Sequence, residues 1–313
     1  MAQRFTTPFN PGSTAADVIA GVDLTGRRVI VTGATSGLGK ETARVMASAG
    51  AEVTIAARNV QAADSTAREI ANRTGNDRVS SGSLDLSDLD SVDAFVSDWS
   101  GPLDILVNNA GIMAPPEQRT SDGRELQFAT NHLGHFRLTL GLHDALASAG
   151  KARVVVLSSV GHVNGPVRFD DPDFTKERYD PWLAYAQSKT ANILFAVEAA
   201  ARWAPDRIAV NALNPGRIWE TGLGRHMDAP PASFDPSGKS GVTEKNTAQG
   251  AATSVLLAAS PLVEGITGKY FEDCQEAGPY IPGVRRGVAD YAIDPDNARA
   301  LWDLSLKLSN ADH

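Results

Sequence analysis

A tyrosine and a lysine stand four positions apart in the stretch Y-A-Q-S-K, from Tyr185 to Lys189. Residues at this spacing lie on one face of a helix, so the ammonium would lie beside the phenol. A free phenol, with a pKa of about 10, is a poor acid at neutral pH, and a nearby positive charge lowers that pKa. The pair could therefore exchange a proton with a substrate. Any long helix can contain such a pair by chance, so its interpretation depends on the rest of the sequence.

A glycine-rich run, V-T-G-A-T-S-G-L-G-K-E, places Gly33, Gly37 and Gly39 between an apolar stretch and a helical one. Glycines at a strand-to-helix turn let backbone N–H groups and the helix N-terminus approach a pyrophosphate. Many such turns contain glycine, so the run is informative mainly because a buried strand and a helix flank it. It predicts a dinucleotide site.

The second expected strand ends in Ala56, Ala57, Arg58 and Asn59, with no carboxylate among them. An acidic side chain at this place would bind the 2′-hydroxyl of NAD. Arg58 instead offers a planar cation that suits a 2′-phosphate. An exposed arginine at a strand end is the plain alternative, but the missing carboxylate makes NADP(H) the favoured cofactor.

Short β-branched runs alternate with longer amphipathic ones along most of the chain, which is typical of a parallel sheet covered by helices. We therefore predict an α/β fold: a single doubly wound Rossmann-type domain with a seven-stranded parallel sheet and helices on both faces. The domain is expected at 25–313, after an N-terminal extension at 1–24. Strands are expected at 27–33, 52–58, 78–86, 103–109, 152–159, 207–215 and 266–271, and the main helices at 40–50, 123–149, 184–203 and 246–259.

Two stretches interrupt the alternation. Residues 163–182 are rich in Pro and Asp, and residues 225–241 are rich in Pro, Gly and Ser. Loops this long in a compact domain are often functional, and active-site lids are a common case. We expect substrate loops at 160–183 and 217–245, with plain surface insertion as the competing interpretation.

Composition narrows the functional class. The formal net charge of −8 argues against an extended nucleic-acid surface and against attraction to anionic membranes. The single cysteine, Cys274, excludes an internal disulfide and any cysteine-based zinc site. No apolar run is long enough to span a bilayer, and the N-terminus lacks the apolar core of a secretory signal. These features indicate a cytoplasmic protein; its oligomeric state and any partner of its N-terminal extension stay open.

Seven motifs occur in one order: TGATSGLG, LDL, NNAG, NHLG, SSVGH, YAQSK and NPG. With them the chain resembles the short-chain dehydrogenase/reductase family over about Leu24 to Phe271. The sequence NHLGHF and an FDD-containing insertion before the tyrosine are most similar to the branch of retinol dehydrogenases and protochlorophyllide reductase.

The resemblance implies a role for each matching residue. Tyr185 would be the general acid–base group, Ser159 would donate to the substrate oxygen, Lys189 would grip the nicotinamide ribose, and Asn131 would position a relay water. The serine is assigned to Ser159 rather than Ser158. The cofactor residues implied or predicted are Gly33, Thr35, Ser36, Gly37, Leu38, Gly39, Arg58, Asp85, Leu86, Asn108, Ala110, Gly111, Tyr185, Lys189, Pro215, Gly216, Ile218 and Thr221.

Two features depart from the family pattern. Ser159 and Tyr185 are about twice as far apart in sequence as is usual, although the retinol-dehydrogenase-like branch shares this insertion. The threonine expected at position 220, which would bind the carboxamide, is Glu220, and Thr221 follows it. A one-residue bulge would restore the contact, so Thr221 is a weak candidate.

Further candidates lie near the expected loops. His162, Trp219, His226 and Met227 could contact the substrate. Tyr179 and Trp182 could line the pocket or only pack the insertion. His132 and His135 stand one turn apart, but without further ligands at metal spacing they are interpreted as packing and hydrogen-bonding residues, and no metal site is predicted.

The function predicted is an NADP-dependent oxidoreductase of the carbonyl reductase or alcohol dehydrogenase type, acting on a bulky, apolar small molecule. A catalytically silent NADP sensor is an alternative, although sensors generally lack the Tyr/Lys pair. A nucleotide-sugar epimerase or dehydratase is another, and those enzymes carry a different glycine spacing. A reductase of C=C bonds on the same fold is the third. Which carbonyl or alcohol reacts is not written in these motifs.

Overall fold

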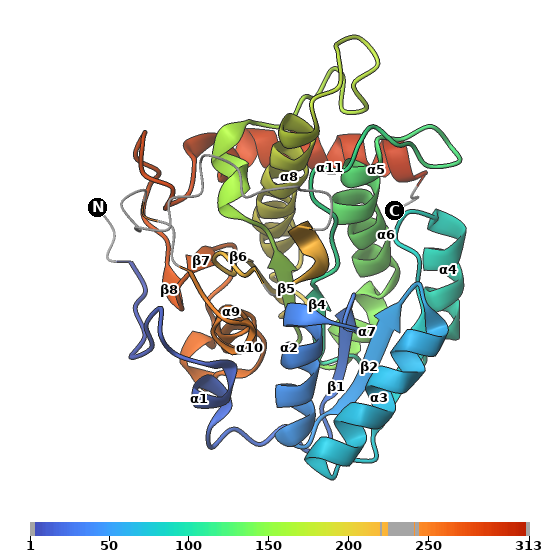
Figure 1. Ribbon diagram of the computed structural model, residues 1–313, viewed down its shortest axis with the longest axis vertical. Coiled ribbons are helices and arrows are strands. Elements are labelled where there is room, and N and C mark those ends of the chain that lie inside the picture. Colours follow the sequence, from blue (N-terminus) through green and yellow to red (C-terminus); the bar gives the residue numbers. More distant parts are fainter. Residues whose placement is uncertain (1–3, 220, 225–240, 242–243, 311–313) are drawn as a thin grey trace.

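The centre of the molecule is a twisted sheet of eight strands in the order β3-β2-β1-β4-β5-β6-β7-β8 (Figure 1). The structure is a computed structural model that describes residues 4–219, 221–224, 241 and 244–310. Neighbouring strands are parallel except β7 and β8, which are antiparallel. The strands are β1 (Arg28–Thr32), β2 (Glu52–Ala57), β3 (Val79–Ser83), β4 (Ile105–Asn108), β5 (Arg153–Leu157), β6 (Ala209–Asn214), β7 (Tyr270–Glu272) and β8 (Gln275–Glu276).

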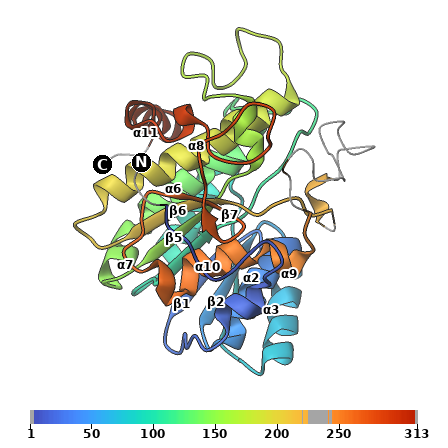
Figure 2. The same cartoon turned by 90° about the vertical axis from the view of Figure 1, so that its left-hand side faces the viewer.

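Helices cover both faces of this sheet (Figure 2). The first face carries α1 (Ala15–Ile19), α2 (Gly37–Ser48), α3 (Val60–Thr74), α9 (Thr247–Gly250) and α10 (Ala252–Ala259). The second face carries α4 (Leu89–Asp98), α5 (Leu126–Phe128), α6 (Gly134–Gly141), α7 (His143–Ser148) and α8 (Pro181–Arg202), and α11 (Pro295–Ser309) packs on α8. This arrangement is the doubly wound fold expected from the sequence.

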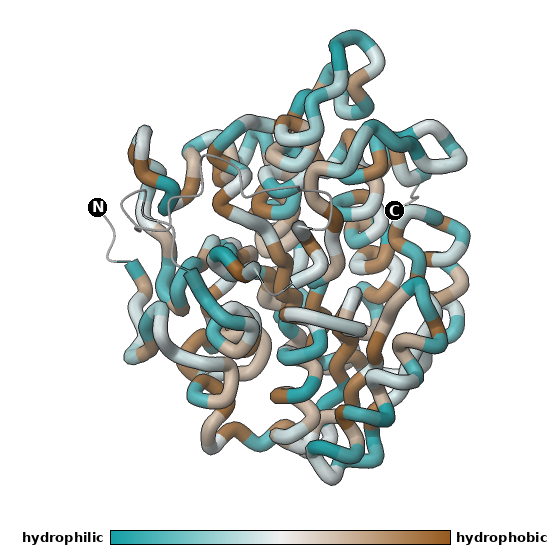
Figure 3. The backbone as a smooth tube through the Cα atoms, in the orientation of Figure 1, coloured by the Kyte–Doolittle hydropathy of each residue, from teal (hydrophilic) through white to brown (hydrophobic). Residues whose placement is uncertain are grey.

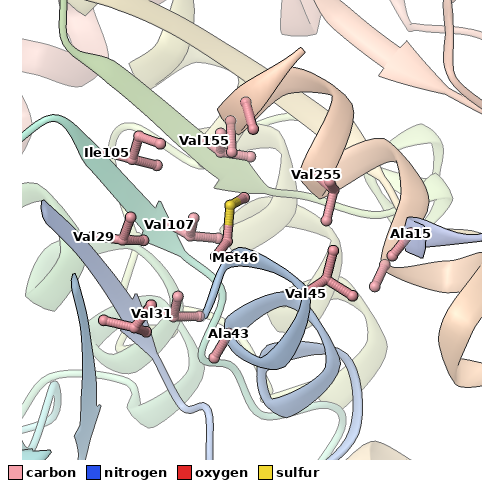
Figure 4. Packing of buried hydrophobic residues seen from close by; sticks show 14 of the residues in the cluster. Ala15, Val29, Val31, Ala43, Val45, Met46, Ile105, Val107, Val155 and Val255 are labelled. Carbon is pink, nitrogen blue, oxygen red and sulfur yellow. The ribbon is translucent and has the colours of Figure 1, made fainter. Parts of the chain in front are cut away.

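Alternate residues of the strands face alternate layers. Val29 and Val31 of β1 are buried with Met46 of α2 and Val255 of α10 (Figure 4). Ile30, between them, is buried with the residues of α4, α6 and α8. Most residues of the central strands β1, β4 and β5 are therefore apolar, which explains the hydrophobic runs in the sequence. Along the tube of Figure 3, the hydrophobic colour accordingly concentrates on the inner elements.

The sheet contains one reversal of strand order that places the ligand site. From β1 the chain builds outward through β2 and β3, and it then returns to place β4 on the other side of β1. Loops at the carboxyl ends of β1 and β4 consequently diverge and leave a crevice, where ligands of open α/β sheets bind.

The structure adds elements that the sequence interpretation did not contain. β8 is an eighth, antiparallel strand, and α11 is a long helix in a region where none was expected. The helix expected at 123–149 is divided into α5, a π-helical turn at Ala129–Leu133, α6 and α7. Within the described residues, no helix has the length and apolarity needed to cross a membrane.

The N-terminal segment is attached to the edge of the sheet. The backbone N–H of Phe5 donates to Glu276 Oε2 at 2.7 Å, and the Thr7 hydroxyl donates to the Cys274 carbonyl at 2.9 Å. Buried side chains of α1, including Val18, pack in the core of the first face. Burial and hydrogen bonding thus tie this segment to β8 and α10.

Candidate active site

A cavity of about 650 Å³ lies at the carboxyl edge of the central strands. It is lined by residues that follow strands β1 to β6, by the first turns of α8, and by Arg285 of the C-terminal segment. Of the residues that sequence predicted for cofactor and catalysis, the following line it: Gly33, Thr35, Ser36, Gly37, Leu38, Gly39, Arg58, Asp85, Leu86, Ala110, Gly111, Ser159, Tyr185, Lys189, Pro215, Gly216, Ile218 and Thr221.

The glycine loop leaves no room for a side chain at two of its glycines. Gly33 has φ of +64°, and a Cβ there would lie 2.8 Å from Ala110. A Cβ on Gly39 would collide with the side chain of Asn109 and lie 2.9 Å from Ala34. Ser36 begins α2 without capping it through its side chain. These residues and the start of α2 line the cavity, and the first N–H groups of a helix lack partners within it, so the loop fits a pyrophosphate.

Arg58 follows β2 and lines the cavity. Its guanidinium is largely exposed, with 77% of the side chain accessible, and its Nε lies 4.0 Å from Asp85 Oδ2. Such a long, exposed ion pair contributes little to stability and leaves the guanidinium able to bind another anion. A phosphate group near this position could accept a charge-assisted hydrogen bond from it.

Asn108 is the predicted cofactor residue that the structure places behind the cavity wall. Its Nδ2 donates to Thr139 Oγ1 at 2.9 Å, and the residue is buried. Its neighbour Asn109 lines the cavity instead and donates from Nδ2 to the Thr32 carbonyl at 2.7 Å. Adjacent residues of a strand point to opposite faces, and sequence alone did not show which asparagine faces the ligand.

Tyr185 lies in a close-fitting site against the loop after β5. The Ser159 side chain forms a hydrogen bond with it, and a Cβ on Gly161 would come within 2.8 Å of its ring. The hydroxyl of Ser159 also accepts from the Gly161 N–H at 3.0 Å. Ser158 differs, because its hydroxyl donates to the Lys189 carbonyl at 2.7 Å. Geometry thus favours Ser159 as the serine that faces a substrate.

Lys189 lies one turn beyond the tyrosine and is buried. Its Nζ donates to the Leu157 carbonyl at 3.1 Å and lies 5.7 Å from the centre of the Tyr185 ring. Burial lowers the pKa of Lys189 to about 8. The ammonium is therefore charged at neutral pH and close to its titration range.

The expectation that Lys189 lowers the pKa of Tyr185 does not hold in this structure. Burial raises the pKa of Tyr185 to about 12, and only the hydrogen bond from Ser159 opposes the rise. Loss of water around the phenol disfavours its charged form. In this state the phenol is protonated at neutral pH.

Asn131 stands in the π-helical turn and joins three segments. Its Oδ1 accepts from the Ile112 N–H at 2.8 Å, and its Nδ2 donates to Ser188 Oγ at 3.0 Å. Gly111 allows this approach, because a Cβ there would lie 3.2 Å from Asn131 Oδ1 and 3.4 Å from Lys189 Nζ. Asn131 therefore lies beside the lysine, although its side chain is engaged with protein atoms.

The carbonyl of Asn131 faces a buried histidine. His135 Nδ1 lies 3.0 Å from it, and His135 Nε2 lies 2.8 Å from Thr32 Oγ1. The Thr32 oxygen already accepts from the N–H groups of Asn109 and Ala110, so its proton goes to Nε2 and the imidazole donates from Nδ1. Burial lowers the pKa of His135 to about 4 and keeps the ring neutral.

The residues between Tyr185 and Lys189 do more than set the spacing. Gln187 donates from Nε2 to the Pro172 carbonyl at 2.6 Å, which ties α8 to the insertion at 163–182. Ser188 accepts from Asn131, as described above. Both side chains are fully buried.

His162, predicted as a substrate contact, lies outside the cavity. It is fully buried, its Nδ1 lies 2.7 Å from the Ser159 carbonyl, and its Nε2 accepts from the Ala289 N–H at 3.2 Å. The ring thus connects the loop after β5 to the C-terminal segment. Sequence could not reveal this, because the segment that covers His162 is more than a hundred residues away.

Of the other residues predicted near the loops, some line the cavity and some do not. Trp182 and Trp219 line the cavity, whereas Tyr179 packs the insertion through Glu125 and Gln127. His226 and Met227 lie outside the described residues. His132 is buried among aromatic rings and contacts Ser305 Oγ at 2.7 Å. Over the described ranges, no group of three His, Cys, Asp or Glu side chains could hold a metal ion.

Several lining residues carried no recognised signal in the sequence. Thr130 and Asn109 adjoin predicted motifs and could have been found by extending them. Arg285 comes from the C-terminal segment, for which no function was predicted. Those that lie with Ser159 and Tyr185 are Met113, Val160, Asn164, Leu223 and Arg285.

Comparisons with known proteins agree with this geometry. The profile of the short chain dehydrogenase family matches residues 27–230. The chain is 54% identical over 294 residues to a probable oxidoreductase of Streptomyces lividans, covering 90% of this chain and 97% of the relative. It is 36% identical over 289 residues to human retinol dehydrogenase 13, covering 90% of this chain and 84% of the relative.

Among solved structures, one from Mycobacterium paratuberculosis, of an uncharacterised protein, superimposes with a TM-score of 0.74 at 36% identity. The match covers 96% of this chain and 98% of that chain. The similarity therefore extends beyond the part that the family profile matches and includes the C-terminal segment.

Proposed function

The chain belongs to the short-chain dehydrogenase/reductase family, in its retinol-dehydrogenase-like branch, and from that premise we propose that it is an NADP-dependent oxidoreductase. The reaction proposed is the interconversion of a ketone or aldehyde with its alcohol. The observation that carries the proposal is the meeting of Ser159, Tyr185 and Lys189 in one cavity with a glycine loop that fits a pyrophosphate.

The chain's own residues handle the proton. Tyr185, which lines the cavity, donates it to the oxygen of a bound carbonyl. Ser159 donates a hydrogen bond to the same oxygen as negative charge develops there. When bound, the nicotinamide of NADP(H) supplies or accepts the hydride.

Lys189 and Asn131 support this donor. The buried ammonium of Lys189 lies beside Gly111, where a ribose hydroxyl can reach it, and its charge favours the phenolate that forms when Tyr185 gives up its proton. Asn131 holds the turn against Ile112 and Ser188, and thereby fixes the position of α8.

Arg58 supports NADP(H) over NAD(H). A 2′-phosphate would gain a charge-assisted contact with the exposed guanidinium, and the loose pair with Asp85 would be exchanged for it. The fold and this cation together are the reason for naming the cofactor.

The proposal is tested with a panel of ketones, aldehydes and alcohols, followed by absorbance with NADPH and with NADH. Turnover with preference for NADPH is expected. Tight NADPH binding without turnover of any carbonyl would favour a cofactor sensor. Reduction of enones at the C=C bond alone would favour the alternative reductase chemistry.

A further inference from the structure

Arg285 enters the cavity from a part of the chain remote from every recognised motif. It lies on the segment after β8, and its Nη1 donates to Asn164 Oδ1 at 3.3 Å. Asn164 ends the short helical turn that begins directly after Ser159. Both residues line the cavity together with Ser159 and Tyr185. Through Asn164 the guanidinium is therefore linked to the turn that begins after Ser159.

The charge of Arg285 has no carboxylate partner among the residues that the structure describes. Neighbouring Arg286, in contrast, is paired with Asp273 and Glu272, and Arg217 is paired with Glu244. Burial is the main cause that lowers the pKa of Arg285; Tyr280 opposes this effect and Arg217 adds to it. A partly dehydrated guanidinium beside a second cation is costly unless an anion joins it.

The backbone around Arg285 is held firmly. The Tyr280 N–H donates to the Val288 carbonyl at 2.8 Å, and the Val288 N–H donates to the Gly278 carbonyl at 2.8 Å. The Gly287 N–H donates to Glu272 Oε1 at 2.9 Å. These bonds close the segment on itself and fasten it to β7, so Arg285 is presented from a fixed support.

Apolar side chains also line the cavity, among them Val160, Trp182 and Leu223. We propose that the substrate carries a carboxylate at a distance from its reacting carbonyl or carbinol carbon, and that Arg285, aided by Asn164, binds this carboxylate. A guanidinium presents paired N–H donors that match the two carboxylate oxygens. The inference rests on the proposed function, and it names the substrate class for the same site.

Matched carbonyl pairs test the proposal. Purified enzyme with NADPH is assayed on 3- and 4-carboxybenzaldehyde and on their methyl esters, for the wild type, Arg285→Gln and Arg178→Gln. Arg178 is exposed in the insertion and does not line the cavity, so its variant removes the same charge. We expect the wild type to prefer at least one acid over its ester by about tenfold or more in kcat/KM. Arg285→Gln should abolish that preference, while Arg178→Gln keeps it within about twofold.

A binding measurement makes the outcome independent of turnover. Isothermal titration of the NADPH complex with 3- and 4-(hydroxymethyl)benzoate, and with their methyl esters, forms complexes that cannot react. Weaker binding of the acids alone in Arg285→Gln would support the inference even if no aldehyde is reduced, and in that case only the proposed function fails.

Three results would overturn the inference. One is equal or better use and binding of the esters by the wild type. Another is a loss in Arg285→Gln that affects acids and esters alike. The third is weakened binding of NADPH itself in Arg285→Gln, measured by fluorescence, which would assign the guanidinium to the cofactor.

Discussion

The phenol of Tyr185 is packed against Gly161 and hydrogen-bonded to Ser159, so its hydroxyl can be removed without disturbing the ring. We predict that Tyr185→Phe lowers kcat by roughly 10²- to 10⁴-fold, the usual contribution of a general acid. Binding of NADPH should stay within about twofold, since the ring still fills its place. Steady-state kinetics and fluorescence titration measure the two quantities.

Tyr179→Phe is the matched control. This tyrosine bonds to Glu125 and Gln127 and does not line the cavity. Its variant should retain turnover and lose only stability. Equal losses of kcat in the two variants would contradict the role given to Tyr185.

The cofactor preference also depends on a single residue. Arg58→Asp should lower kcat/KM with NADPH by roughly 10- to 100-fold, because a contact between charged groups is lost and a repulsion replaces it. The kcat/KM with NADH should stay the same or increase, since a carboxylate can bind the 2′-hydroxyl. Arg68→Asp, on the exposed face of α3, makes the same charge change away from the cavity and should alter neither. A wild-type enzyme that already prefers NADH would contradict the assignment.

Among the elements, the turn after β5 and helix α8 depend most on close contact. A Cβ on Gly161 would lie 2.8 Å from the Tyr185 ring, so Gly161→Ala must displace the ring or the turn. We expect kcat to fall by about tenfold or more while the far-ultraviolet circular dichroism is unchanged, because a misplacement of about 1 Å is costly in catalysis.

Gly165→Ala is the control for that variant. It lies at the end of the same turn, has φ of 177°, and a Cβ there would meet nothing closer than 3.8 Å. Its kcat should remain near that of the wild type. Similar losses in both variants would show that the turn, and not its fit to the ring, limits the reaction.

Helix α8 was predicted from the sequence, but most of its contacts were not. Its existence and the shared face of Tyr185 and Lys189 followed from helical spacing. The contacts of Gln187 with the insertion and of Ser188 with Asn131 did not, because their partners lie on other elements. The π-helical turn at Asn131 was missed for a similar reason: it depends on packing around the residue and leaves the apolar pattern of the helix nearly unchanged.

At the scale of the whole molecule, buried histidines make stability dependent on pH. Burial lowers the pKa of His132 to about 3, and that of His135 and His162 to about 4, from an ordinary 6.5. Below pH 6.5 the unfolded chain therefore binds more protons than the folded one, so the free energy of unfolding decreases as the pH is lowered. Burial raises the pKa of Glu125 from 4.5 to about 6, so between these pH values the folded chain binds about one more proton at Glu125 than the unfolded chain. This proton offsets one of those that the histidines bind only in the unfolded chain.

The net difference is on the order of two protons, so we predict a loss of roughly 2–3 kcal/mol per pH unit between pH 6 and pH 4.5. Urea denaturation at several pH values measures this slope. His132→Asn should reduce this slope by the contribution of about one proton, since one of the three rings is then absent. An unchanged slope in that variant would show that His132 is already charged in the folded protein.

The sequence by itself determined the fold class and the main site constellation. Buried parallel strands must be continuously apolar, glycines must stand where backbone meets phosphate, and a helix places Tyr185 and Lys189 on one face. These are local constraints, and local patterns record them. β8, α11 and the attachment of the N-terminal segment were not predicted, because short edge pairings and surface packing leave weak patterns.

Only the tertiary structure decided which residues share the cavity. It placed Asn109 in the wall and Asn108 behind it, buried His162 outside the cavity, and brought Arg285 into the cavity with Ser159. It also reversed the expected shift of the Tyr185 pKa, because burial of a group depends on everything packed around it. Spacing along the chain fixes which side chains share one element, whereas burial and contacts between remote segments exist only once the chain has folded.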